Sequence, residues 1–567
     1  MQKPSIEKEI VQPGEIITEK SASGGSPVKK STSLFISGVV ILAVSNVLQK
    51  LIGMSLKIPL HGLLGGEGMG YYAIAYAIYK WFYMISTAGL PVAISIMISE
   101  SRAKGNFREV GKIYKITLMF LMIIGFTGSL IMMTGSKLFA MLYNQPKSYL
   151  AIIALAPTLF FICISSALRG FFQGYQTMIP TAVSQLIESL GKLTIGILLA
   201  EVTLGRGLGY NVVAAATVLG LTIGVLIGMI FLIIYKLRFR SSLYDAEYLR
   251  PDSDTLPIRS GSQIAKTLFM IAVPITLSAS IMPFTSLLDS MIISRQLQSI
   301  GFNSDLALTY LGDYDALAVS LWNVPPALIY PISYSIVPLI SAAKAAGDNA
   351  RVKLIMNSTI KVASLIALPS SLGMSVLAEP ILKLLFNDES AERVAPLLSI
   401  LALSIFFISM LAVTNSILQV FHHERKPIIS MLAGSIIKIA ASYTLIGIPA
   451  IGIFGAPIST FLCYFTIMMF NFYFVARYVG MIPDVKAMLI RPFISAVFCA
   501  GAALAAYKLL SVVIPASIAT ICAIAVAGLV YGVLIFVIGA ITRDDILLLP
   551  KGEKLCGFFE RLHLLRS

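Results

Sequence analysis

Apolar runs long enough to cross a lipid bilayer follow one another along almost the whole chain, and they constrain its fold more than any other feature. A membrane-spanning helix needs about 20 predominantly apolar residues. Only helices and closed barrels satisfy their backbone groups in lipid, and barrel strands are short with alternating polarity, which these runs do not show. The sequence therefore predicts an all-α polytopic membrane protein. Fourteen spans are expected, at approximately 34–58, 69–98, 113–134, 148–172, 178–200, 211–236, 266–294, 314–341, 356–378, 394–420, 427–448, 451–476, 487–508 and 513–541.

The composition excludes several classes of protein. Hydrophobic residues make up 57% of the 567 residues, charged residues only 13%, and the mean hydropathy is +0.86. Soluble domains carry about 25% charged residues, so a water-soluble enzyme, a disordered chain and a disulfide scaffold are excluded. The formal charge of +15 lies mostly between apolar runs, which indicates membrane topology and lipid contact rather than nucleic acid.

Basic residues in the connecting segments predict the orientation. On the side of the amino-terminal tail 27 Lys and Arg residues are counted, against 7 on the opposite side. Cytoplasmic loops carry the excess of basic residues, so both termini are expected in the cytoplasm, in the plasma membrane of a bacterium. Residues 1–30 are polar and show no cleavable signal, so they are expected to form a disordered cytoplasmic tail.

An internal repeat divides the expected spans into two lobes. The only two tryptophans, Trp81 and Trp322, are 241 residues apart, each in the second span of a group of six. Around them Gly105-Asn106 aligns with Gly347-Asp348, and farther on Lys192 aligns with Lys438. Six is an even number, so the copies should run in parallel, as in secondary transporters that bind substrate between repeats. The expected segments are the tail 1–30, an amino-terminal lobe 31–236, a cytoplasmic linker 237–265, a carboxy-terminal lobe 266–477, two further helices over 478–541 and a cytoplasmic tail 542–567.

Neither catalysis nor metal binding is indicated by the sequence. The five cysteines are scattered, without the spacing of a metal site or a disulfide framework. Asp252 and Asp254 lie in a polar segment too short to hold a catalytic domain. We therefore expect no enzyme activity, no cofactor and no metal.

Ionisable residues inside the apolar runs are the candidate functional residues, because such groups at bilayer depth normally face a cavity or a partner. The first span holds Lys50 and Lys57, two helical turns apart on one face, and the second holds Lys80. These three are the primary candidates for binding an anion. Snorkelling toward the membrane surface is an alternative for Lys57 and Arg295, and Glu188 and Lys192, four residues apart, form either cavity charges or a structural pair. The secondary candidates are Glu188, Lys192, Asp289, Arg295 and Lys438.

Several motifs resemble those of the MOP exporter superfamily. They are NVLQKLIG at 46–53, GGEGMGYY at 65–72, Gly89-Leu90-Pro91 and LRGFFQG at 168–174. The last is particularly similar to the group of stage V sporulation protein B and MurJ flippases. The resemblance implies flipping of an undecaprenyl-pyrophosphate-linked precursor, most specifically lipid II, by alternating access. It also implies a cavity lined by cationic residues of spans one, two and eight. Lys50, Lys57 and Lys80 match the first two spans, but no basic residue lies in the eighth between Tyr314 and Ile340.

Lysine suits phosphate as a point charge, so the cationic cavity fits a diphosphate. The expected partners are a lipid-linked oligosaccharide and membrane lipids, with the protein as a monomer. Two other functions remain open: a flippase for a teichoic, capsular or sporulation-specific glycan, and a cation-coupled drug antiporter of the same superfamily. The antiporter would need acidic groups deep in the membrane, for which only Glu188 and Asp289 are available.

Overall fold

The computed structural model describes residues 27–239, 257–386, 388–480 and 489–539. Across these ranges the chain forms α-helices joined by short turns, and the described residues include no strand. The predicted tail 542–567 and nearly all of the predicted tail 1–30 lie outside the described residues, as does most of the linker 237–265.

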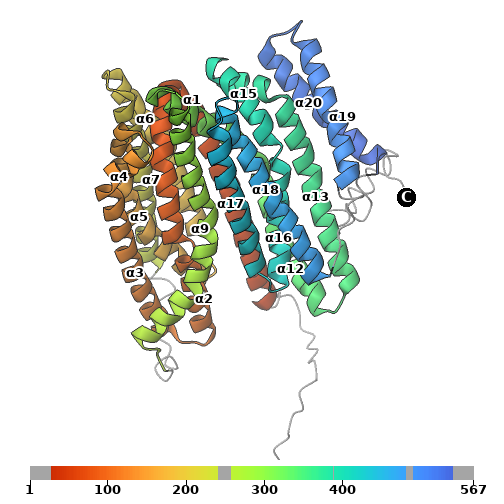
Figure 1. The fold of residues 1–567 in the computed structure, drawn as a ribbon. Helices are drawn as coiled ribbons and strands as arrows, with labels where there is room; N and C mark the ends of the chain where they lie inside the picture. Colours follow the sequence, from red (N-terminus) through yellow and green to blue (C-terminus); the bar gives the residue numbers. More distant parts are fainter. Residues whose placement is uncertain (1–26, 240–256, 387, 481–488, 540–567) are drawn as a thin grey trace, which may run out of the picture.

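The helices form two groups that stand side by side (Figure 1). The first contains α1 (Pro27–Thr87), α2 (Leu90–Ala103), α3 (Phe107–Thr134), α4 (Ser136–Leu142), α5 (Tyr149–Gly174), α6 (Ile179–Gly205) and α7 (Tyr210–Phe239). The second contains α10 (Ser304–Asp313), α11 (Ser320–Trp322), α12 (Val324–Ala345), α13 (Asn349–Val376), α14 (Ala378–Leu385), α15 (Asp388–Ala402), α16 (Ile405–Val420), α17 (Arg425–Ile446) and α18 (Gly455–Phe474). The helix α9 (Gly261–Ser299) runs along the first group in Figure 1 and packs against α1 and α2 of that group and against α17 of the second. Beside α13 lie α19 (Arg491–Leu510) and α20 (Ala516–Val537). The short turns are η1 (Pro146–Ser148), η4 (Tyr314–Val319), η5 (Gly452–Phe454) and η6 (Val475–Val479).

The all-helical membrane architecture is confirmed, whereas the count of fourteen spans is not established. By length and apolar character, 11 helices of the described residues suffice to cross a membrane, or 12 if the bent pair Glu389–Ala402 and Ile405–Val420 forms one span. One of the 11 is the 59-residue stretch Ser45–Ala103, far longer than the roughly 30 Å of a bilayer core requires. Another expected span, α6, falls outside the 11; it carries Glu188, Lys192 and Glu201.

A bend at Gly65 turns α1 into a helical hairpin. Gly65 has φ 60° and ψ −173°, a conformation that essentially only glycine adopts. The expected spans 34–58 and 69–98 therefore meet without a loop between them. Lys50 lies as many residues before this bend as Lys80 lies after it.

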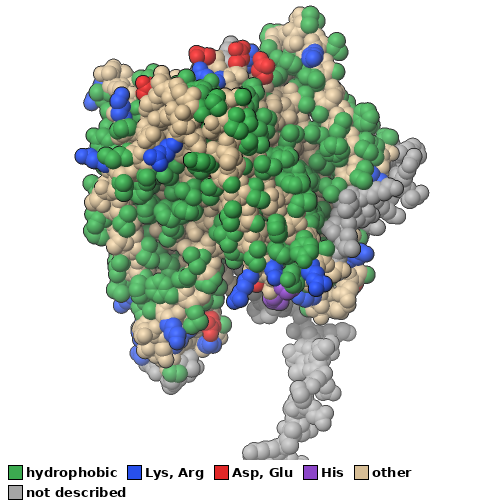
Figure 2. Space-filling view, viewed as in Figure 1, with side chains coloured by type: hydrophobic (Ala, Val, Ile, Leu, Met, Phe, Trp, Pro, Cys, Tyr) green, Lys and Arg blue, Asp and Glu red, His purple; other side chains and the backbone are tan. Residues whose placement is uncertain are grey.

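The distribution of apolar side chains distinguishes the two ends of the bundle. We call the end where α1 begins the inner end, and the end where α1 bends at Gly65 the outer end. Toward the outer end a single buried cluster unites both groups, with residues such as Leu64 of α1, Leu308 of α10 and Leu398 of α15. Toward the inner end there are two separate clusters, one around Ile94 of α2 that also includes Leu268 of α9, and another around Ile360 of α13. The groups therefore share a core at the outer end and have separate cores at the inner end, where the surface is indented between them (Figure 2).

Matched local geometry supports the predicted repeat. Gly105 and Gly347 both have positive φ, 75° and 71°, and each is followed by a helix-capping side chain, Asn106 or Asp348. Farther on, Gln176 and His422 share the left-handed conformation with φ 59° and 60°. A parallel pair of contacts places Arg102 over the Tyr175 ring and Lys344 over the Phe421 ring.

Candidate functional site

The α1 hairpin brings Lys50 and Lys80 to the same level of the bundle. Both side chains are exposed, and the two ammonium groups lie near enough to repel one another. Two like charges on apolar helices are costly unless water or an anion surrounds them. Their placement therefore favours a hydrated space that accepts negative charge.

Lys50 also contacts the opposite group of helices. Its Nζ atom lies 4.6 Å from the centre of the Tyr330 ring on α12, within the range of a cation–π interaction. The amino-terminal half of α1 is in turn fixed to its own group through α6, where Ser45 donates a hydrogen bond to the carbonyl oxygen of Ala182 and Gln49 to Gln185. The candidate lysine thus faces the seam between the groups.

Tyr76, on the second arm of α1, lies at the centre of the charged cluster. The charged groups around it are Lys192, Lys80, Lys57 and Asp315. The Lys192 Nζ atom is 4.6 Å from the Tyr76 ring centre and 5.5 Å from that of Tyr72. Three of the predicted cavity lysines therefore gather around one tyrosine.

The alternative that Glu188 and Lys192 pair with one another is wrong. Glu188 instead accepts a hydrogen bond from Arg169 of α5 at 2.5 Å, and the Arg169 Nε atom donates to Ser184 at 3.0 Å. Both charged side chains are largely buried. Because Glu188, the only acid near Lys192 on α6, is paired with Arg169, it does not neutralise the charge of Lys192.

Asp289 and Lys438 form a separate buried ion pair. The Lys438 Nζ atom lies 2.9 Å from a carboxylate oxygen of Asp289, linking α17 to α9. The hydroxyl of Ser442 donates to the same carboxylate at 2.5 Å and contacts the hydroxyl of Ser459 on α18 at 2.7 Å. The two charges therefore neutralise one another. This pairing was not apparent from the sequence, because the two residues are 149 positions apart.

Arg295 is not brought into the lysine cluster. It is exposed near the carboxy-terminal end of α9, toward the outer end of the bundle. Among the eight candidate residues, the structure thus places Lys50, Lys57, Lys80 and Lys192 together, and places Glu188, Asp289 and Lys438 in ion pairs.

Lys57 is held by an acid of the opposite group. Its Nζ atom donates to the Asp315 carboxylate at 2.7 Å and to the Asp315 carbonyl oxygen at 2.9 Å. Asp315 belongs to η4, a π-helical turn between α10 and α11. This contact joins α1 to the second group on the outer side of Lys50.

A second polar contact closes the outer side one turn beyond Lys57. His61 of α1 hydrogen-bonds to Asp313 at 2.8 Å, and the other oxygen of Asp313 accepts from Arg393 of α15 at 2.5 Å. The side chains of His61 and Asp313 are 1% and 0% exposed. We call Lys57, His61, Asp313, Asp315 and Arg393 the outer lock.

Sequence reasoning missed most of the outer lock and Arg169. Asp313 and Asp315 flank the expected start of the eighth span, where the motif comparison looked only for basic residues. His61 lies just beyond the expected end of the first span. Arg169 lies within the LRGFFQG motif but is not among the candidate charges, and the structure places it in helix α5.

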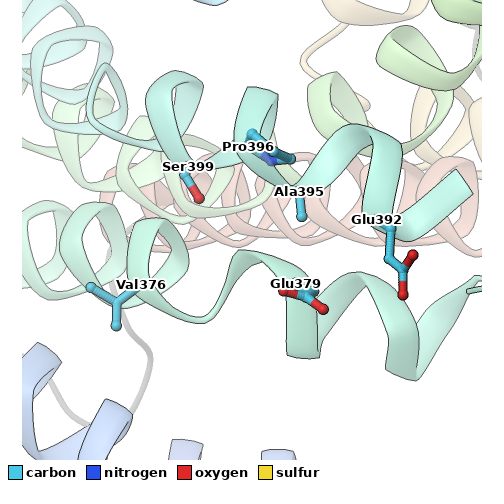
Figure 3. A pocket seen from close by; sticks show the side chains of 6 residues that line it. All are labelled: Val376, Glu379, Glu392, Ala395, Pro396 and Ser399. Atoms are coloured by element: carbon cyan, nitrogen blue, oxygen red, sulfur yellow. The ribbon is translucent and has the colours of Figure 1, made fainter.

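A cavity of about 270 Å³ lies elsewhere, at the outer end of α13, α14 and α15. Figure 3 shows Glu379 and Glu392 among its lining side chains, which also include Val376 and Ser399. Lys383 binds both carboxylates, at 2.9 and 2.7 Å. These hydrogen bonds, first that to Glu392, raise the pKa of Lys383 above its ordinary value. The cavity is distinct from the lysine cluster.

Two protein families match the chain. One, described as "Polysaccharide biosynthesis protein", matches residues 35–344, and another, described as MatE, matches residues 274–444. The first match alone covers more than half of the chain.

Curated proteins of Bacillus subtilis (strain 168) are similar over most of their length. The lipid II flippase MurJ is 24% identical over 469 residues, which cover 79% of this chain and 84% of that protein. Stage V sporulation protein B is 23% identical over 427 residues, covering 75% of this chain and 80% of that protein.

Solved structures share the fold. A lipid II flippase MurJ in an inward closed conformation matches with a TM-score of 0.65 at 13% identity, covering 88% of this chain and 98% of that chain. An inward-facing multidrug resistance MATE family transporter of the MOP superfamily matches with a TM-score of 0.58 at 15% identity, covering 77% and 98%. At these identities the likeness concerns the fold.

Proposed function

Because this chain belongs to the polysaccharide biosynthesis protein family of the MOP superfamily, we propose that it flips a lipid-linked oligosaccharide across a bacterial plasma membrane. The proposed cargo is an undecaprenyl-pyrophosphate-linked peptidoglycan precursor, lipid II, carried from the inner to the outer leaflet. The relatives are flippases and transporters rather than catalysts, so the chain is not an enzyme.

The observation that carries this proposal is the lysine cluster at the seam between the lobes. Lys50 and Lys80 are exposed on apolar helices, and Lys57 and Lys192 lie around the same Tyr76. A diphosphate cannot enter hydrocarbon unaided because burying an unpaired charge is prohibitive. Ammonium groups replace the water that the diphosphate loses, while the polyprenyl chain remains in lipid.

The arrangement of the apolar cores supports entry from the inner end. Apart from α9, whose first half packs into the core of the amino-terminal lobe, the lobes have separate cores there and a common core at the outer end. With both termini in the cytoplasm, as the basic residues indicate, the parted end faces the leaflet where the cargo is loaded. Rocking of the lobes then exposes the lysines to the opposite side. One chain supplies both lobes, so we propose that the monomer is sufficient.

The pairing of the acids disfavours a cation-coupled drug antiporter. Such a protein needs acidic groups free to bind a cation or a proton, yet Glu188 is bound by Arg169 and Asp289 by Lys438. A flippase for another lipid-linked glycan would use the same lysines, because those cargoes share the phosphate group next to the lipid. The experiment must therefore compare cargoes.

The test is flipping by the purified full chain in vesicles, using labelled lipid II and a labelled teichoic acid precursor in parallel. We expect lipid II to reach the opposite leaflet faster than in protein-free vesicles, and faster than the teichoic precursor. Lys50→Ala and Lys80→Ala should each lower the rate at least about thirtyfold, since a hydrogen bond to a charged group contributes about 2 kcal/mol. Lys508→Ala, at an exposed lysine of α19, should leave the rate unchanged.

Two outcomes contradict the proposal. Full activity of the Lys50 and Lys80 variants would remove the assigned site, and transport of the teichoic precursor alone would replace lipid II as the cargo. Depletion of the protein in its own cell offers a second measurement, since the precursor that it carries should accumulate on the inner leaflet.

A further inference from the structure

Lys57 already holds an anion that belongs to the protein. Its ion pair with Asp315 crosses between the lobes at 2.7 Å, and the two side chains remain 16% and 34% exposed. The neighbouring contact between His61 and Asp313 is almost fully buried. Of these two cross-lobe contacts, the Lys57 pair is therefore the one that water and a solute can reach.

The backbone around Asp315 is shaped to hold the Lys57 ammonium. Asp315 lies in the π-helical turn η4, a form of helix that is rare and frequently marks functional sites. The carbonyl oxygen of Asp315 accepts from Lys57 at 2.9 Å and from the Ser320 hydroxyl at 3.1 Å. Lys57 thus receives both a carboxylate and a carbonyl oxygen from one residue.

Within the lysine cluster, Lys57 lies between Lys50 and the contact of His61 with Asp313. Lys50 is two helical turns to its inner side and His61 one turn to its outer side, on the same face of α1. An anion bound between Lys50 and Lys80 has Lys57 as the next cation of the same helix face toward the outer end, with Lys192 beside it at Tyr76. The position of Lys57 connects binding of a cargo with closure of the lobes.

We propose that Asp315 competes with the cargo diphosphate for Lys57, and that the exchange of these two anions releases the outer lock. The inference rests on the proposed function, because it takes the cargo head to be a diphosphate. A phosphate oxygen replaces the Asp315 carboxylate at the Lys57 ammonium, and the freed carboxylate, already one-third exposed, becomes hydrated. No covalent bond is made or broken, and the Lys57 ammonium is paired with an anion before and after the exchange.

The other contacts of the lock do not offer the same exchange. Arg393 is already shared between Asp313 and Glu389, at 2.5 and 2.8 Å, and His61 faces Asp313 and the Phe386 ring. Without cargo these contacts keep the outer end closed. With cargo, loss of the Lys57 contact removes one of the polar links across the seam, so the remaining contacts separate more readily.

The experiment uses the full chain in lipid nanodiscs with undecaprenyl pyrophosphate as the probe. Binding affinity is measured together with a spin-label distance between the outer ends of the two lobes. For Asp315→Asn we expect affinity to rise roughly tenfold, an ordinary size for coupling between two sites, and the outer distance to widen before the probe is added. Asp315→Glu should behave like the unmodified protein, because it restores the competing carboxylate.

Glu392→Gln is the matched control. It removes an ion pair with Lys383 at the same end of the molecule but within one lobe, so neither affinity nor distance should change. Unchanged affinity in Asp315→Asn, with the probe still widening the outer distance, would overturn the proposal. If the unmodified protein fails to bind the probe, or binds it independently of Lys50, the proposed function itself fails.

A measurement on the unmodified protein keeps the proposal testable if Asp315→Asn does not fold. Bound probe should accelerate amide hydrogen exchange in Tyr314–Val319, because η4 loses its contact with Lys57. Exchange that is unchanged or slower in this turn would contradict the inference.

Discussion

The ammonium group of Lys438 lies 2.9 Å from the Asp289 carboxylate, and the two side chains are 10% and 8% exposed. This pair connects α17 to α9 inside the second lobe, away from the lysines at the seam. Breaking a buried pair by removing one partner costs about 3–5 kcal/mol, whereas replacing both charges is often neutral. Variants of this pair can therefore distinguish a role in folding from a role in transport.

Lys438→Met should be strongly destabilising, by about 3–5 kcal/mol, because it leaves Asp289 charged and buried. The double variant Asp289→Asn with Lys438→Met should recover most of that loss. Thermal unfolding of the purified protein in detergent measures both effects. A stable double variant should still flip cargo; if it folds but does not transport, the pair takes part in the transport cycle.

Gly312→Ala should weaken the junction of the lobes at the outer end. A Cβ atom at Gly312 would collide with the backbone of Gly66 and Gly70 on α1, and overpacking of this kind costs about 1–3 kcal/mol. The expected result is a lower unfolding temperature together with a wider spin-label distance across the outer end.

The control for that prediction is Gly373→Ala on α13. No atom lies within 4 Å of the added Cβ position, and alanine is favoured over glycine in a helix by up to about 1 kcal/mol. This variant should be equally or more stable. A loss of stability equal to that of Gly312→Ala would show that close helix approach is not the cause.

Gln176→Gly and His422→Gly should each stabilise the protein, by similar amounts. Both residues have a positive φ near 60°, which costs a residue with a side chain roughly 1–2 kcal/mol. Part of that gain is offset by the greater freedom of glycine in the unfolded chain, leaving about 0.5–1 kcal/mol. Chemical denaturation in detergent measures the change.

Gln173→Gly, three residues earlier but inside α5, is the comparison for the glycine variants. It should lower stability by up to about 1 kcal/mol, because Gln173 has a helical backbone in the last turn of α5 and glycine is unfavourable in a helix. Equal effects at Gln173 and Gln176 would contradict the role assigned to the backbone conformation.

The helical class, which is confirmed, depends on a local pattern of the sequence, and so do the predicted repeat and the candidate lysines. Hydropathy locates an apolar helix, and a constant offset locates a repeat. Lys50 and Lys80 stood out because a charge in an apolar run is unusual whatever surrounds it. Their common level could not be predicted, since it depends on the Gly65 bend and not on a loop of ordinary length.

Such local patterns do not predict which charged residues of different helices form ion pairs. Periodicity places Glu188 and Lys192 on one face of α6, but it does not reveal that α5 presents Arg169 to that face. For the same reason the sequence offered Lys438 no partner, although Asp289 was recognised separately. The acids of the outer lock went unnoticed because they flank an expected span, where charged residues are ordinary.

The common apolar core at the outer end makes the two halves of a transport cycle unequal. Parting the lobes there exposes apolar surface and breaks ion pairs, whereas the apolar clusters at the inner end are separate except where α9 packs into the first lobe. We therefore expect the empty carrier to open more readily at the end where α1 begins than at the end where α1 bends, so that the two halves of the cycle start from different barriers.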